Sequence, residues 1–140
     1  VFESLGCQMK PVEMDAHGMN VRLLEESGAD IAYVMPSHQY PMGVVMPVKR
    51  RQELLSWAGR GEKRYLIEDD YDSEFRYKGK PIPALQGMDQ NGCVIYMGTF
   101  SKAIAPAIRV SYMVLPGDLL DIYRRDCSFY SCTVSRIGVL

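Results

Sequence analysis

A short segment, residues 97–109, could form a covalent bond with a small molecule and hold its phosphate group. It contains Lys102, and Arg109 follows a few residues later. Two hydroxyl side chains, Thr99 and Ser101, lie close to the lysine in the sequence. Lysine forms Schiff bases with carbonyl compounds, and arginine binds phosphate through its planar fork of N–H donors. A molecule with both a carbonyl and a phosphate, such as pyridoxal phosphate, would use both residue types.

A second stretch, residues 65–72, offers complementary chemistry. It begins as an apolar run and ends in carboxylates and a tyrosine: Glu68, Asp69, Asp70, Tyr71 and Asp72. A carboxylate here could pair with the pyridinium nitrogen and keep it protonated, so that the ring accepts electrons. The tyrosine could donate to the ring phenolate. Since ligands in open α/β sheets bind beyond the carboxyl ends of the strands, both stretches place polar residues where a site is expected.

These groups need strands and helices to position them, and the apolar patterning supplies both. We expect strands at residues 7–14, 31–35, 65–68, 93–97 and 110–115, and helices at 21–27, 48–58, from 116 onward and at 129–140. The alternation of strands and helices predicts an α/β fold with a mostly parallel sheet flanked by helices. The short connection between the last two strands allows one antiparallel pair. The run at 31–35 is continuously apolar and predicts a buried strand.

Local signals set the helix boundaries. Asn20 is a plausible N-cap, Gly28 and Gly59 are expected to end the two helices that precede them, and Pro47 suits a first turn. The basic cluster at residues 49–51 is interpreted as a solvated helix face, because three charges are too few to indicate a nucleic-acid site.

Two of the connections between the predicted elements are candidates for functional loops. Residues 36–43, with the sequence PSHQYPMG, follow a strand and combine two prolines with polar and aromatic groups. They are either a binding loop or a rigid connection. Residues 72–90 are polar and read as a long loop with a short strand at 75–77, and long loops in compact domains tend to be functional.

The composition is that of an ordinary globular protein. The 140 residues are 47% hydrophobic and 24% charged, with a net charge of -1. This charge balance gives no indication of nucleic-acid binding. No apolar run approaches the length of a membrane span, and no signal-peptide pattern is present. We therefore expect a cytoplasmic protein with no membrane partner.

The four cysteines do not form a metal-binding or disulfide pattern. They lack CxxC spacing, and the chain has two histidines, so no metal site is expected. One alternative stays open, in which Glu68, Asp69, Asp70 and Asp72 hold Mg²⁺ in a phosphoryl-transfer site, although no P-loop accompanies them.

Three stretches together resemble a known family. PSHQYPMG at 36–43, EDDYDSEFR at 68–76 and GTFSK at 98–102 are similar to motifs of the MocR-type bacterial regulators. These regulators join a GntR-type winged helix-turn-helix to a domain with the aminotransferase fold, fold type I of the pyridoxal-phosphate enzymes. The sequence at 132–136 is similar to the region just before that family's long interdomain helix. The similarity covers nearly all of the chain.

The resemblance implies a role for each matching residue. Lys102 matches the Schiff-base lysine, Asp69 the carboxylate that pairs with the pyridine nitrogen, and Tyr71 the tyrosine near the phenolate oxygen. The phosphate-binding groups are matched by Arg109, Ser101 and Thr99. His38 and Tyr40, which we also expect among the cofactor-binding residues, fall in the loop that corresponds to NPxG in many aminotransferases. Tyr40 replaces the asparagine of that loop and favours the regulators, whereas His38 is either a cofactor contact or a structural residue.

The resemblance also implies an architecture and a function. We expect residues 1–140 to be a fragment of the pyridoxal-phosphate-binding large domain, without the winged helix-turn-helix and the small C-terminal domain. The expected function is an effector domain that senses an amine or amino acid through a Lys102 aldimine. The alternative is a working aminotransferase that acts on an amino acid. DNA would be bound only through the domain outside this chain, the parent protein would be a homodimer, and the isolated chain would have no turnover.

Overall fold

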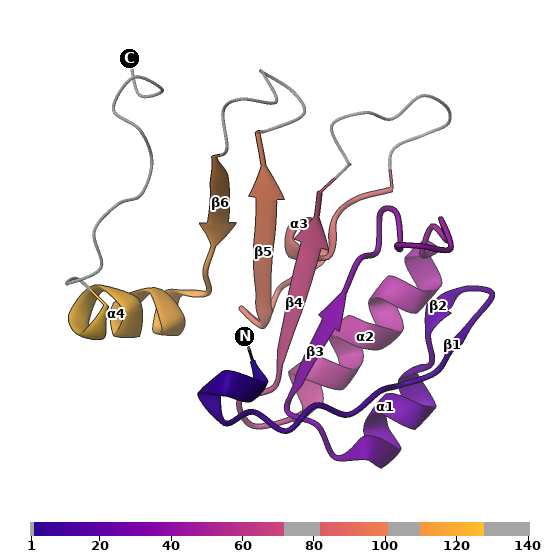
Figure 1. Ribbon diagram of the computed structural model, residues 1–140, viewed down its shortest axis with the longest axis horizontal. Coiled ribbons are helices and arrows are strands. Elements are labelled where there is room, and N and C mark those ends of the chain that lie inside the picture. Colours follow the sequence, from indigo (N-terminus) through magenta and orange to yellow (C-terminus); the bar gives the residue numbers. More distant parts are fainter. Residues whose placement is uncertain (1, 72–81, 101–109, 128–140) are drawn as a thin grey trace.

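A four-stranded sheet forms the centre of the protein in this computed structural model, which describes residues 2–71, 82–100 and 110–127. The strands are β3 (Ile31–Val34), β4 (Tyr65–Asp70), β5 (Val94–Thr99) and β6 (Ser111–Val114), in that spatial order. The first three are parallel, and β6 runs antiparallel to β5. Figure 1 shows the four strands side by side. The expected mostly parallel sheet with one antiparallel pair is therefore confirmed.

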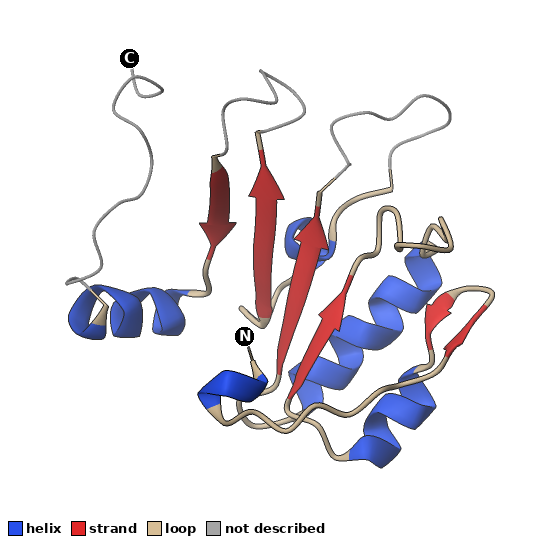
Figure 2. Ribbon diagram, viewed as in Figure 1, coloured by secondary structure: helices blue, strands red, loops and turns tan. Residues whose placement is uncertain are grey.

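The helices flank this sheet (Figure 2). They are α1 (Val21–Ser27), α2 (Val48–Arg60), α3 (Leu85–Met88) and α4 (Gly117–Asp126), with a short 3-10 helix, η1 (Glu3–Leu5), near the N-terminus. The helices α2 and α3 lie on the same side of the sheet, and α1 lies beside α2. Within the described ranges, none of the helices combines the length and the apolar character needed to cross a membrane.

The core lies between the sheet and the helices. Side chains from α1, α2 and α3 pack on one face of the sheet: Leu24, Leu54, Trp57 and Leu85 against Ala32, Val34, Leu66 and Val94. Burying each large side chain contributes about 1.5–3 kcal/mol. Because strand residues alternate between faces, positions 66, 68 and 70 of β4 face the helices. Positions 65, 67 and 69 face the other side, here called the open face.

The start and end of α1 follow from its sequence. The Asn20 side chain accepts hydrogen bonds from the N–H groups of Arg22 (3.1 Å) and Leu23 (3.3 Å). Gly28 ends the helix with a φ of 64°, a left-handed conformation that favours glycine. Both predicted boundaries of this helix are confirmed.

Two predicted strands are wrong in detail. The segment at 7–14 does not form a long strand: only β1 (Met14–Asp15) pairs, with β2 (Gly18–Met19), in a short hairpin. No strand of the described part of the chain pairs with residues 7–13, so no ladder can extend there. The β3 strand is not buried on both faces, because Ile31 is 53% exposed on the open face.

The helix α2 departs from expectation in two ways. It passes through Gly59 and ends at Arg60. Glycine at 59 instead makes room for a neighbour, since a Cβ there would lie 2.6 Å from the Asn91 Nδ2 atom. The basic cluster is not a solvated face: Arg51 is fully buried and the Arg50 side chain is only 13% exposed. The short helix α3 falls where a loop was expected, and the predictions for 75–77 and 129–140 lie outside the described residues.

Candidate functional site

The carboxyl end of β4 separates its three acidic side chains. Glu68 and Asp70 lie on the helix-covered face and are buried, whereas Asp69 lies on the open face and is partly exposed. This follows from the two-residue alternation of a strand. The carboxylates that the magnesium alternative requires are therefore divided between two faces. Among the residues that the structure describes, no three His, Cys, Asp or Glu side chains are grouped to hold a metal ion.

Glu68 has a structural role. Its carboxylate accepts hydrogen bonds from the N–H groups of Leu85 (2.9 Å) and Gln86 (3.0 Å), the first two residues of α3. Burial raises the pKa of Glu68, while these N–H groups and the nearby charge of Arg51 act in the opposite direction. Glu68 thus anchors the start of α3 beneath the sheet, and Asp69 is the carboxylate left for the open face.

Asp69 has a partner that the sequence did not predict. The Tyr33 hydroxyl donates a hydrogen bond to the Asp69 Oδ2 atom. Tyr33 lies opposite Ile67 in the β3–β4 register, so Asp69, two residues further along, shares its face. Burial and the Asp69 carboxylate raise the pKa of Tyr33 well above its ordinary value. In the sequence, Tyr33 is the one tyrosine in the apolar run at 31–35. That it contacts Asp69 could not be inferred, because the contact depends on the register between β3 and β4.

Tyr71 links the end of β4 to the PSHQYPMG loop. Its hydroxyl donates to the His38 carbonyl oxygen at 2.9 Å, and the two rings meet edge to face with centroids 6.4 Å apart. The loop folds back on itself, since the Gln39 N–H group donates to the Val44 carbonyl at 3.0 Å. The Tyr40 side chain is 70% exposed. The structure therefore brings two of the three predicted motifs into contact through Tyr71 and His38.

Thr99 lies at the carboxyl end of β5, on the same face as Asp69. Asp69 is opposite Met97 in the register, and Thr99 is two residues further along. The Thr99 hydroxyl donates to the Val110 carbonyl at 3.2 Å. The segment with Ser101, Lys102 and Arg109 lies outside the described residues. The residues on either side of it, Phe100 and Val110, are hydrogen-bonded at this same end of the sheet (3.0 Å).

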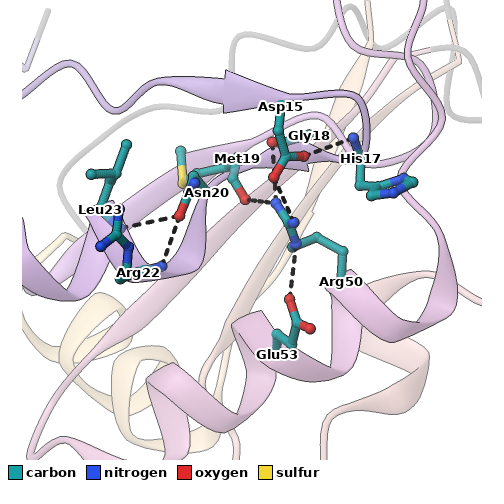
Figure 3. Close-up of polar contacts among 9 residues, drawn as sticks. All are labelled: Asp15, His17, Gly18, Met19, Asn20, Arg22, Leu23, Arg50 and Glu53. Carbon is teal, nitrogen blue, oxygen red and sulfur yellow. Dashed lines mark hydrogen bonds and ion pairs between the residues drawn. The ribbon is translucent and has the colours of Figure 1, made fainter.

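Arg50 holds the β1–β2 hairpin against α2 (Figure 3). The Arg50 guanidinium pairs with Asp15 (2.8 Å) and Glu53 (2.9 Å) and donates to the carbonyl oxygens of Gly18 (3.3 Å) and Met19. The hydrogen bond from Arg50 lowers the pKa of Asp15. These contacts explain why the arginine is mostly buried, and they fix the hairpin relative to the helix.

The described residues suit a cationic heteroaromatic ring that carries oxygen substituents. Asp69 offers a carboxylate held by a phenol donor, and Tyr71 and Thr99 place further hydroxyl groups at the same end of the sheet. A carboxylate stabilises a protonated ring nitrogen, and hydroxyl groups bind ring oxygens or phosphate. The donor set thus fits pyridoxal phosphate.

Sequence comparison relates the chain to transcription regulators and to an aminotransferase. It is 45% identical over 135 residues to the HTH-type transcriptional regulator YdeL of Bacillus subtilis, covering 96% of the chain and 29% of the relative. It is 38% identical to the probable rhizopine catabolism regulatory protein MocR of Rhizobium meliloti, covering 89% and 25%. It is 39% identical to aromatic-amino-acid aminotransferase 1 of Thermococcus litoralis, covering 73% and 26%. No family model matches.

Structure comparison places the fold among aminotransferases. An archaeal alanine:glyoxylate aminotransferase superposes with a TM-score of 0.81 at 33% identity, covering 94% of this chain and 35% of that one. The kynurenine aminotransferase of Pyrococcus horikoshii, solved in complex with PMP, gives a TM-score of 0.70 at 33% identity, covering 82% and 32%. The chain therefore spans about a third of the structures and under a third of the curated relatives that it matches.

Proposed function

We propose that this chain, which matches the aminotransferase-like part of the GntR/MocR-type regulators, belongs to the pyridoxal-phosphate-binding effector domain of a bacterial transcription regulator. It has the large-domain fold of the fold type I aminotransferases. The parent protein would sense an amine or amino acid at the cofactor. The observation that carries the proposal is the Asp69 carboxylate on the open face, next to the Tyr71–His38 contact.

Each motif residue has a task in this proposal. Asp69 would hold the protonated ring nitrogen. Tyr71 would lie at the ring oxygen and would donate to it by turning its single O–H proton away from the His38 carbonyl. Thr99, Ser101 and Arg109 would bind the phosphate, and Lys102 would hold the cofactor covalently. When bound, pyridoxal phosphate supplies a carbonyl that exchanges amines and a ring that accepts electrons. His38 would act through its backbone carbonyl, which holds the Tyr71 phenol in place before the cofactor binds.

The partners follow from this role. Residues 1–140 would be one part of the large domain, and a winged helix-turn-helix elsewhere in the parent would bind DNA. Amine exchange would shift a conformational equilibrium that the DNA-binding domain senses, because a ligand favours the state that it binds more tightly. We propose a homodimeric, cytoplasmic parent protein.

A second candidate is an aminotransferase that acts on an amino acid. The identity to the Thermococcus litoralis enzyme and the superposition on solved aminotransferases favour it. In this reading Lys102 would move the α-proton of the substrate as general base. The regulators match a longer part of the chain at higher identity, 135 residues at 45% against 111 at 39%, which is why we rank the regulator first.

Cofactor binding can be tested in the complete gene product. Pyridoxal phosphate is titrated while the visible absorbance is followed, and the complex is then reduced with borohydride and mapped by peptide mass. We expect one label, on Lys102, and none in the Lys102→Ala control. Labels scattered over surface lysines, equal in wild type and control, would refute the cofactor site.

Two further assays separate the regulator from the enzyme. DNA binding is measured with and without candidate amines, and amino transfer to a keto acid is measured with the same amines. Amine-dependent DNA binding without turnover supports the regulator. Steady turnover without DNA binding supports the aminotransferase.

A further inference from the structure

Arg51 is a fully buried arginine that the proposed cofactor chemistry does not use. It lies in the first turns of α2, and its side chain has no exposed surface. A buried guanidinium must satisfy its N–H donors, and unsatisfied charges are very costly in a protein interior. The partners of Arg51 therefore show which parts of the chain the arginine holds.

Three of these partners are backbone carbonyl oxygens from separate segments. The Nε atom donates to Met46 (3.1 Å), Nη2 to Pro36 (2.9 Å) and Nη1 to Pro83 (2.8 Å). Pro36 and Met46 are the two ends of the segment that contains PSHQYPMG, and they also bond to each other, from the Met46 N–H group to the Pro36 carbonyl at 2.9 Å. Arg51 thus closes the base of this loop.

The third partner connects the loop to the end of β4. Pro83 lies just before α3, whose first N–H groups are held by Glu68. Glu68 in turn lies next to Asp69 on β4, and its carboxylate interacts electrostatically with the Arg51 guanidinium. Arg51 and Glu68 together fix the loop, the start of α3 and the strand end in one arrangement.

The loop held in this way carries the contact that defines the candidate site. The His38 carbonyl accepts the Tyr71 hydroxyl at 2.9 Å, and His38 lies within the segment that Arg51 closes. A fixed guanidinium fork with several aligned donors positions a backbone better than a flexible ammonium group. We propose that Arg51 is a positioning residue, which sets the place of the His38 carbonyl and therefore of the Tyr71 phenol relative to Asp69. This inference rests on the proposed function.

The test compares Arg51→Lys with Leu54→Ala in the complete gene product. Lysine keeps the charge but loses the fork. Leu54 is a fully buried residue of the same helix, and its truncation destabilises the core by leaving a cavity while keeping the three hydrogen bonds of Arg51 available. Both variants are studied well below their unfolding temperatures. We expect Arg51→Lys to weaken pyridoxal phosphate binding by about tenfold or more and to shift the pH midpoint of the bound-cofactor absorbance. Leu54→Ala should change neither.

Amide hydrogen exchange provides a readout that needs no cofactor. In Arg51→Lys, peptides covering residues 36–46 should exchange about tenfold faster than in wild type, while Leu54→Ala leaves them protected relative to the rest of the protein. If wild type binds no cofactor, the proposed function fails, and the exchange measurement still decides whether Arg51 holds the loop.

Three outcomes would overturn the inference. The first is wild-type affinity and pH midpoint in Arg51→Lys with unchanged exchange at 36–46. The second is an equal loss of cofactor affinity in Leu54→Ala. The third is failure of Arg51→Lys to fold while Leu54→Ala folds, which would assign Arg51 to general stability.

Discussion

Tyr33 and Asp69 form a donor–acceptor pair on the open face of the sheet, near the carboxyl end of β4. The Tyr33 phenol gives Asp69 a fixed orientation, which the proposed contact with a protonated ring nitrogen would require. The raised pKa of Tyr33 keeps the phenol protonated over the physiological range, so the donor is always present. This pair shows how an uncharged neighbour can prepare a charged group for a ligand.

We predict that Tyr33→Phe lowers the free energy of unfolding by about 1 kcal/mol at neutral pH, a small value because the pair is partly exposed to water. The folded pKa of Tyr33 is above its unfolded value, so its contribution is present below pH of about 10 and is lost as the pH rises toward the folded value. Urea unfolding at neutral and alkaline pH should show the difference between wild type and variant shrinking above that point. If the difference in unfolding free energy between wild type and Tyr33→Phe stays constant with pH, the hydrogen bond between Tyr33 and Asp69 is refuted.

Glu68 has a pKa shift of the same sign as Tyr33, but it applies in a lower pH range. Its folded pKa is raised mainly by burial, so the folded protein holds a proton that the unfolded chain releases between the ordinary and the raised pKa. Wild type therefore gains stability from this group as the pH falls through that window. Glu68→Gln should cost about 1–3 kcal/mol near pH 7, because one N–H group at the start of α3 loses its acceptor.

The pH dependence provides the measurement for this second prediction. The stability difference between wild type and Glu68→Gln should grow as the pH is lowered from neutral toward the ordinary value of a glutamate. The exposed carboxylate of Glu26 offers the control, since Glu26→Gln should alter the unfolding free energy little at any pH. A wild-type advantage that shrinks on acidification would show that the folded pKa of Glu68 is not raised.

Among the elements, β5 and β6 depend on one glycine. A Cβ at Gly98 would lie 2.4 Å from the Tyr112 Cζ atom on the neighbouring strand. The Tyr112 ring is in turn stacked on Phe100, with ring centroids 4.8 Å apart. Phe100 is the last described residue before Lys102, so the close approach at Gly98 connects the packing of the strands to the start of the lysine segment.

Gly98→Ala should therefore destabilise the protein by about 1–3 kcal/mol, the usual effect of overpacking, and should weaken cofactor binding. Gly87→Ala is the matched control, because Gly87 lies in α3 with nothing near its added Cβ. That substitution should be neutral or stabilising by up to about 1 kcal/mol. Urea unfolding and the absorbance titration measure both effects. Equal stability of the two variants would refute the close packing at Gly98.

The elements also show what the sequence could predict. Apolar runs located β3 to β6, and the short connection before β6 allowed its antiparallel direction, because these depend on local patterns. The burial of Arg50 and Arg51 could not be predicted, since it depends on carbonyl groups from distant segments. The position of Asp69 on the open face follows from the alternation of side chains along β4. Its partner Tyr33 could not be predicted, because that requires the register between β3 and β4. The roles of Lys102, Ser101 and Arg109 stay predictions.

At the scale of the whole molecule, the sheet has two different faces. The helices α1, α2 and α3 cover one face, whereas the N-terminal segment crosses only part of the other (Figure 1). An apolar cavity of about 280 Å³ lies there, lined among others by Phe2, Met9, Ile31 and Ile67. Ile31 and Met113 are more than half exposed. Apolar surface of this kind is typical of an interface or of a face that further chain covers.

The last prediction concerns the 140-residue chain on its own. The chain spans about a third of the aminotransferases that it resembles, and a site built from several segments works only when all of them are held in place. We therefore expect the chain to bind pyridoxal phosphate at least about tenfold more weakly than the complete gene product. We also expect no amino transfer. The absorbance titration is run on both proteins, with Lys102→Ala as the control for surface lysines. Equal affinity, or turnover by the 140-residue chain, would mean that the strand ends of β4 and β5 and the lysine segment form a sufficient site by themselves.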